Sequence, residues 1–106
     1  MFRFGFEGRL GAAHALELPF MFDMLDRVNG EVGEFLFGDD PPEELATTVH
    51  GAWSNFVKTG SPRHPTLPEW PTYDSTRRAT MELDVESRVV DDPDAEKRQL
   101  WDGIEY

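Results

Sequence analysis

The sequence predicts an α+β fold with one long amphipathic helix, several short helices and a few short strands. Two patterns predict this class. Apolar side chains recur at helical spacing in the middle of the chain, at Leu45, Val49, Trp53, Phe56 and Val57. Aromatic side chains at the start alternate with other residues, at Phe2, Phe4 and Phe6, which is the two-residue period of a strand. A length of 106 residues allows one domain at most.

The first third of the chain is predicted to hold a strand, a short helix and a loop. Three aromatic side chains on one strand face need a sheet to bury against. No earlier segment supplies a neighbour, so we expect part of the sheet to be missing and the domain to be loosely packed and prone to associate. Residues 17–25 are expected to be helical, with Pro19 in the first turn. The apolar stripe of this helix comprises Phe20, Met21, Met24 and Leu25. The pair Asn29-Gly30 and then Gly33 predict a loop before a brief apolar piece at 34–37.

The central helix is predicted with clear signals at both ends. Asp40 is a suitable N-cap, and the pair Pro41-Pro42 is expected at the helix start. The acidic pair Glu43-Glu44 in the first turn and Lys58 in the last turn favour the helix dipole. Gly60 is expected to take the left-handed conformation that terminates the helix.

The remainder of the chain is predicted to contain two strands and a closing helix. Residues 62–71 are proline-rich and irregular. Short strands are expected at 80–83 and 88–90, and an amphipathic helix at 94–103. The few apolar positions of that helix are Ala95, Leu100 and Trp101.

Composition excludes several classes of partner and site. The net charge of −11, from 21 acidic and 10 basic residues, disfavours binding to nucleic acid or to an anionic membrane surface. The absence of cysteine excludes disulfides and thiolate metal sites. No apolar run is long enough for a membrane span, and Glu7 and Arg9 interrupt any signal peptide, so we expect a cytoplasmic location.

The stretch from 8 to 22 carries the strongest candidate for chemistry. His14 is flanked by the small residues 11–13 and by Ala15, which allow the loop to press close to a nucleophile. A histidine in such a loop is suited to take a proton from a hydroxyl. His50, at the edge of the long helix's apolar face, is expected to be solvated or partly packed, and His64 to be exposed in the proline-rich loop.

This stretch closely resembles the catalytic-histidine motif of the type B carboxylesterases, the family that includes the cholinesterases. The matching residues are Ala12, Ala13, His14, Ala15, Glu17, Leu18, Pro19, Phe20 and Phe22. Many members have glycine at the position of Ala15. Further resemblances follow in the family's order, at Trp53, Asn55, Phe56, Gly60, Pro62, Trp70, Pro71, Tyr73, Asp74, Met81 and Trp101.

The resemblance implies that residues 1–106 form a partial, C-terminal part of a carboxylesterase domain with the α/β-hydrolase fold. The family's triad runs serine, acid, histidine along the chain, with the serine in Gly-x-Ser-x-Gly, and no serine here lies in that pattern. His14 is thus implied as the general base and acid of carboxylic-ester hydrolysis, without a cofactor. The serine, the acid and the oxyanion loop would come from the missing N-terminal part, so the chain alone is expected to be inactive. Glu17 is implied as an acid that supports His14; the alternative is a first-turn helix acid.

Three other interpretations stay open. The chain is alternatively a small interaction module whose exposed apolar faces, around Phe2, Phe4, Phe6 and Trp53, meet a partner chain. It is alternatively a gene fragment without a function of its own. His14 and Glu17 are also potential metal ligands, but no third ligand lies at a telling spacing, so we expect no metal.

Overall fold

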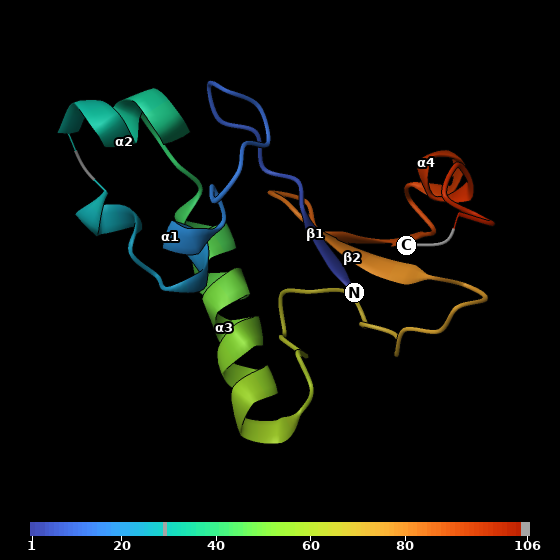
Figure 1. The fold of residues 1–106 in the computed structure, drawn as a ribbon. Coiled ribbons are helices and arrows are strands. Elements are labelled where there is room, and N and C mark those ends of the chain that lie inside the picture. The colour runs from blue at the N-terminus through green and yellow to red at the C-terminus, as the bar shows by residue number, and fades with distance from the viewer. Residues whose placement is uncertain (29, 105–106) are drawn as a thin grey trace.

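The computed structural model describes residues 1–28 and 30–104, which form a three-stranded sheet and a group of helices (Figure 1). The elements in chain order are β1 (Phe2–Phe4), α1 (Leu18–Met21), the 3₁₀ turn η1 (Leu25–Arg27), α2 (Gly30–Phe37), α3 (Glu43–Thr59), β2 (Ala79–Leu83), β3 (Arg88–Asp91) and α4 (Ala95–Gln99). This mixture of one long helix, short helices and short strands is the predicted one.

The sheet joins the two ends of the chain. Its strand order is β1-β2-β3, with β1 parallel to β2 and β3 antiparallel to β2. Phe2 lies opposite Met81 and Phe4 opposite Leu83. The expectation that the first strand lacks a neighbour is therefore wrong on one side, because β2 returns from the last third of the chain to pair with it. β1 remains an edge strand of this sheet.

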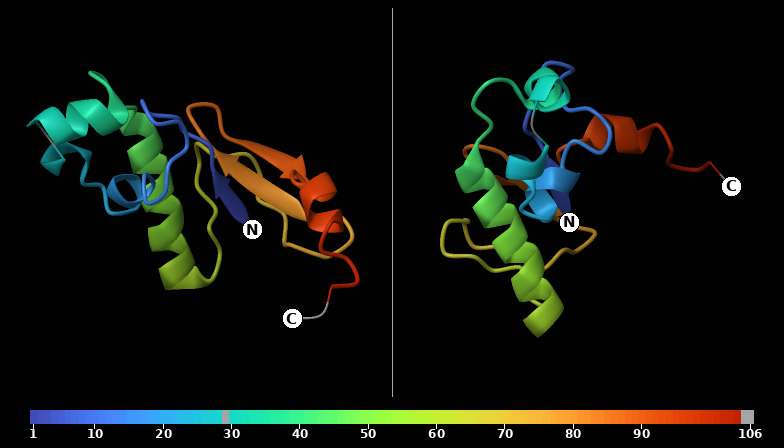
Figure 2. Two further views of the ribbon diagram at one scale, coloured as in Figure 1. Left: turned by 45° about the horizontal axis from the view of Figure 1, so that its top comes forward. Right: turned by 90° about the vertical axis from the view of Figure 1, so that its left-hand side faces the viewer.

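The apolar core lies between the sheet and the helices α1 to α3, which Figure 2 shows on one side of the strands. Its buried side chains are Leu16, Phe20, Phe37, Leu45, Ala46, Val49, Met81 and Leu83. Phe4 and Phe6 pack on Phe20, with ring centroids 5.0 and 5.4 Å apart. Phe4 and Phe6 thus find a core, which is formed by helices and by the neighbouring strand β2.

The helix predicted at 17–25 is broken in two. Asp23 has a φ of 51°, in the left-handed region, which ends α1 before η1 begins. Phe20 is fully buried, whereas Met24 is exposed and does not join the predicted stripe. The break arises because a left-handed residue cannot continue the ladder of helical hydrogen bonds.

The prediction of a loop at residues 29–33 is wrong for residues 30–33, because these residues form the start of α2. Asn29 lies outside the described residues. Gly33 is buried inside this helix. A Cβ there would lie 2.0 Å from the carbonyl oxygen of Val28. Gly33 therefore allows two backbone segments to lie close together. In the sequence alone, such a glycine looks the same as one that marks a loop.

The long helix α3 confirms its predicted C-terminus and corrects its start. Gly60 has a φ of 77° and donates its N–H to the carbonyl of Phe56, as a terminating glycine does. At the other end the N-cap is Pro42, so Asp40 is not the cap. Val57, 81% exposed, and Phe56, 56% exposed, lie off the apolar face. The buried positions of the helix are Leu45, Ala46, Thr48, Val49 and Ala52.

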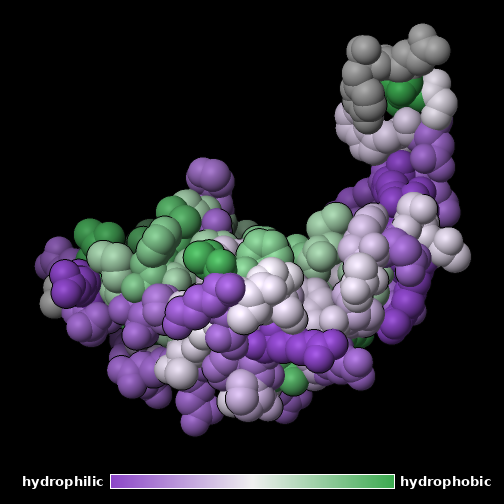
Figure 3. Space-filling view, turned by 90° about the horizontal axis from the view of Figure 1, so that it is seen from below, coloured by the Kyte–Doolittle hydropathy of each residue, from purple (hydrophilic) through white to green (hydrophobic). Residues whose placement is uncertain are grey.

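The closing helix is shorter than predicted. α4 ends at Gln99, and Leu100 and Trp101 are exposed rather than packed. Two hydrogen bonds from the Arg98 guanidinium to Asp92 tie α4 to the end of β3. Figure 3 shows the C-terminal segment projecting from the rest of the molecule. Accordingly, the radius of gyration is 15.4 Å, compared with about 13 Å for a compact domain of this length.

Candidate functional site

The candidate site begins with the loop that leaves the carboxyl end of β1 and carries His14 into α1. Gly8 and Gly11 close this loop on itself by two backbone hydrogen bonds of 3.2 and 3.0 Å. A Cβ at Gly8 would lie 1.9 Å from the carbonyl oxygen of Leu36, so the loop is pressed against the end of α2. Gly8 thus lets the loop pack on a neighbouring helix, and Gly11, with a φ of 73°, lets the loop turn back on itself.

His14 lies in a turn that continues directly into α1. The N–H of Leu16 donates to the carbonyl of Ala13 at 3.3 Å, and the N–H of Leu18 donates to Ala15 at 3.3 Å. Ala15 has a φ of 63°, which glycine adopts more easily than alanine, and this is the position where glycine is common in the resembling motif. His14 is exposed, whereas Leu16 is only 4% exposed. The turn therefore buries Leu16 and presents the imidazole at the surface.

The position of this loop in the sheet is suited to chemistry. β1 and β2 are parallel, and the His14 loop follows the carboxyl end of β1. In open sheets with parallel strands, ligands bind beyond the carboxyl ends of the strands. In chain order, His14 thus lies on the loop that follows the carboxyl end of a parallel strand.

Glu17 occupies the N-cap position of α1. Its carbonyl accepts the N–H groups of Phe20 and Met21, both at 3.0 Å. Its side chain makes no capping hydrogen bond. Across residues 1–28 and 30–104, no hydrogen bond joins Glu17 to His14. The backbone of Glu17 therefore starts the helix that follows the histidine turn.

The two other histidines have defined partners. Nδ1 of His50, on α3, lies 2.8 Å from the carbonyl oxygen of Met21, the last residue of α1. His64 is partly buried over the helix at Gly51, so the prediction that it is exposed is wrong. Its Nδ1 lies 2.8 Å from Oγ1 of Thr66, and that hydroxyl lies 2.6 Å from the hydroxyl of Thr48. Met21 lies 29 residues before His50, and Thr48 lies 18 residues before Thr66, so sequence spacing does not reveal these two contacts. The contact of His64 with Thr66 is local, at two residues' separation.

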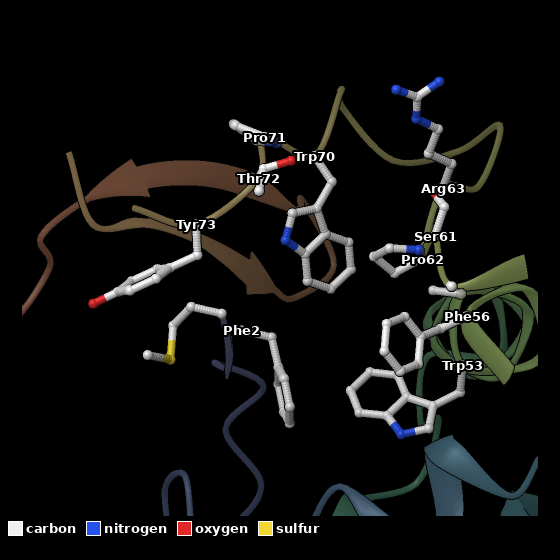
Figure 4. A pocket seen from close by; sticks show the side chains of 13 residues that line it. Phe2, Trp53, Phe56, Ser61, Pro62, Arg63, Trp70, Pro71, Thr72 and Tyr73 are labelled. Carbon is white, nitrogen blue, oxygen red and sulfur yellow. The ribbon is translucent and has the colours of Figure 1, made fainter. Parts of the chain in front are cut away.

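A cavity of about 500 Å³ lies away from His14, between the start of β1, the end of α3 and the segment 60–73 (Figure 4). Aromatic side chains dominate its wall: Phe2, Trp53, Phe56, Trp70 and Tyr73. Phe2 and Trp53 meet edge to face, with centroids 4.6 Å apart. Several residues of the resembling signatures thus form one aromatic surface, which sequence spacing alone does not reveal.

Charged groups form a ladder across the sheet face opposite the core. Glu82 on β2 accepts from Arg3 of β1 at 2.5 Å and pairs with Arg88 of β3 at 3.4 Å. The hydrogen bond from Arg3 is the main cause that holds the pKa of Glu82 below its ordinary value, and burial opposes it. This ladder joins all three strands and lies apart from His14.

The described part of the chain contains neither a metal-ligating cluster nor a membrane-spanning helix. No group of three or more histidine, cysteine, aspartate or glutamate residues there is arranged to hold a metal ion. None of its helices is long and apolar enough to cross a membrane. His14 and Glu17 therefore have no third partner for a metal site among residues 1–28 and 30–104.

The class of protein follows from this arrangement together with comparison to known families. Residues 4–101 match the Carboxylesterase family, and the chain belongs to it. The predicted resemblance is thereby confirmed along nearly the whole sequence.

Known relatives agree with this assignment. The chain is 40% identical over 88 residues to the para-nitrobenzyl esterase of Bacillus subtilis, covering 83% of this chain and 17% of the esterase. It is 40% identical over 86 residues to the phenmedipham hydrolase of Pseudarthrobacter oxydans, covering 79% of this chain and 17% of the hydrolase. The chain thus spans about a sixth of the length of these relatives.

Solved structures show the same fold. A para-nitrobenzyl esterase structure superposes with a TM-score of 0.79 at 36% identity, covering 93% of this chain and 21% of that structure. A Geobacillus stearothermophilus carboxylesterase superposes with a TM-score of 0.76 at 41% identity, covering 95% of this chain and 21% of the enzyme. These neighbours have the α/β-hydrolase fold, so the fold prediction is confirmed: the chain has the structure of one part of that fold.

Proposed function

We propose that this chain is the histidine-bearing part of a carboxylic-ester hydrolase and that His14 is its general base and acid. One observation carries the proposal: His14 is presented on a turn that follows the carboxyl end of a parallel strand, in a chain of the carboxylesterase family. Leu16, two residues after the exposed His14, is buried and fixes the turn to the core.

The proposed reaction is acyl transfer to water. His14 takes the proton of a serine hydroxyl as that oxygen attacks the ester carbonyl, and then returns the proton to the departing alcohol. Ala13 and Ala15 on either side leave space for the serine to approach. A water molecule then hydrolyses the acyl group with the same histidine as base.

The remaining catalytic groups are proposed to come from polypeptide outside these 106 residues. No serine of this sequence lies in Gly-x-Ser-x-Gly, and the chain spans about a sixth of the relatives' length. We propose that the complementary part of the hydrolase contacts the open edge of β1, beside the aromatic surface at Phe2 and Trp53. On this proposal the chain alone is inactive, because the base His14 has neither the serine nucleophile nor the oxyanion site that ester hydrolysis needs.

Glu17 is proposed to act through the backbone. Its carbonyl starts α1, so it holds the helix that anchors the turn. Its carboxylate, close to the N-terminal end of α1, adds a favourable charge there. A contribution to the imidazole itself would require the side chain to reorient once the rest of the active site is in place.

The test is a chimera in which residues 1–106 replace the corresponding part of the Bacillus subtilis para-nitrobenzyl esterase. We expect hydrolysis of a p-nitrophenyl ester, and a decrease in kcat of about 10⁴-fold for His14→Ala. Leu10→Ala, an exposed position of the same loop, is the matched control and is expected to leave kcat unchanged.

Two outcomes would contradict the proposal. One is a chimera whose kcat is the same with His14→Ala as without it. The other is saturable ester hydrolysis by the 106-residue chain alone that is lost in His14→Ala, because this would place the nucleophile within the chain.

A further inference from the structure

We propose that His50 is a positioning residue for His14 and acts through a hydrogen bond that holds α1 against α3. This inference rests on the proposed function of His14. Nδ1 of His50 lies 2.8 Å from the carbonyl oxygen of Met21, although the two residues are far apart in sequence. The bond joins the helix that carries the histidine turn to the longest helix of the molecule, and both helices lie side by side in Figures 1 and 2.

The histidine turn and α1 form one rigid unit. Backbone hydrogen bonds run without interruption from the carbonyl of Ala13 to the N–H of Met24. A displacement of α1 is therefore transmitted to the turn and so to the imidazole of His14. Whatever fixes α1 also fixes the direction in which His14 is presented.

Apolar burial holds this unit on its core side. Leu16 and Phe20 are both buried in the core, and Met21 packs partly buried against it. Apolar contacts are non-directional, so they allow small rotations of the unit. The bond from His50 to the Met21 carbonyl adds a directional contact from α3, which limits these rotations.

The chemistry of the bond specifies where the proton of His50 lies. A carbonyl oxygen only accepts hydrogen bonds, so Nδ1 of His50 must carry a proton and donate it. His64 is the contrasting case in the same molecule, because its Nδ1 lies 3.3 Å from the backbone N–H of Thr66 and accepts from it. Neutral His50 is thus the Nδ1–H tautomer, and neutral His64 is the Nε2–H tautomer.

The experiment is nuclear magnetic resonance of the ¹⁵N-labelled 106-residue chain at pH 8.5, about two units above the pKa of a histidine in a model peptide. We expect the ring nitrogen shifts to show the Nδ1–H tautomer at His50 and the Nε2–H tautomer at His64. An Nε2–H tautomer at His50 would overturn the proposal, because the bond to Met21 would then lack its donor.

Two variants separate positioning from general stability. His50→Ala is expected to accelerate amide exchange at Leu16 and Leu18 by about threefold to tenfold, the effect of one lost hydrogen bond on a local opening. His50→Asn retains a donor close to the Nδ1 position and is expected to restore the slower exchange. The matched control His64→Ala is expected to leave exchange at these two amides unchanged. Equal exchange in the Ala and Asn variants of His50, or acceleration spread equally over β2, would overturn the proposal.

In the chimeric esterase, His50→Ala is expected to lower kcat by about threefold to tenfold with little change in KM, because a reacting group held less well spends less time in the productive geometry. His50→Asn is expected to restore kcat. If His14→Ala leaves the activity of the chimera intact, the proposed function fails, while the tautomer and exchange measurements still decide whether His50 fixes α1. If His14 is essential but His50→Ala leaves kcat unchanged, only the role of His50 in positioning His14 is refuted.

Discussion

Phe20 is at the centre of the core, and its replacement by alanine is expected to cost about 3–5 kcal/mol of stability. The side chain is fully buried and contacts three other rings, those of Phe4, Phe6 and Phe37, at centroid distances of 5.0, 5.4 and 5.9 Å. A phenylalanine buries about 200 Å², which at about 25 cal/mol per Å² gives about 5 kcal/mol as an upper bound. The lower part of the range applies where neighbouring rings partly fill the cavity.

The assay is equilibrium unfolding of the chain in urea, followed by far-ultraviolet circular dichroism. Phe22→Ala is the matched control, since Phe22 follows α1 closely and is 64% exposed. We expect the control to lose less than about 1 kcal/mol, because most of its surface is already in water. Equal losses in the two variants would refute the assignment of Phe20 as the central anchor, and with it the account of how the His14 turn is held.

Two further predictions concern the backbone and the sheet. Gly8→Ala is expected to cost about 2 kcal/mol or more of stability, because its Cβ would lie 1.9 Å from a backbone oxygen. The control Gly5→Ala meets only side-chain atoms, at 3.2 Å or more, which can move, so it is expected to cost less than about 1 kcal/mol. Equal melting temperatures for the two variants would contradict this prediction. The lowered pKa of Glu82 predicts stability that is complete above about pH 4.5 and is lost as the pH falls through the folded pKa, since the unfolded carboxyl takes up its proton first. Glu82→Gln removes this dependence, at a cost of about 1 kcal/mol at neutral pH, and parallel stability curves of the two proteins from pH 6 to pH 3 would refute it.

The secondary structure was predictable where the signal is local. The terminating Gly60 and the strand period of Phe2 and Phe4 depend on neighbouring residues, and both are as predicted. Gly33 misled the prediction because a glycine that permits a close contact cannot be distinguished by sequence from one that breaks a helix. Asp40 misled it because two prolines followed, and the helix began only after both of them.

The pairing of β1 with β2 was beyond a local pattern. The strands are separated by most of the chain, and no feature of Phe2 or Phe4 identifies Met81 and Leu83 as their neighbours. The predicted apolar face of α3 also included too many residues. Val57 has the correct helical spacing but lies past the end of the core and is exposed. Helical spacing predicts which side of a helix faces inward, and tertiary packing decides how much of that side is covered.

The candidate site divides in the same way between local and long-range determinants. The motif consists of His14 and the small residues next to it in the chain, so it can be recognised from the sequence. Its placement depends on three contacts with segments far along the chain: the loop against the carbonyl of Leu36, Phe20 in the core, and α1 against His50. A substitution at any of these three contacts leaves the motif intact and still alters where the imidazole lies. The motif therefore specifies which group is presented, whereas the packing of the loop on α2 and of α1 on α3 specifies its direction, and the proposed role of His14 requires both.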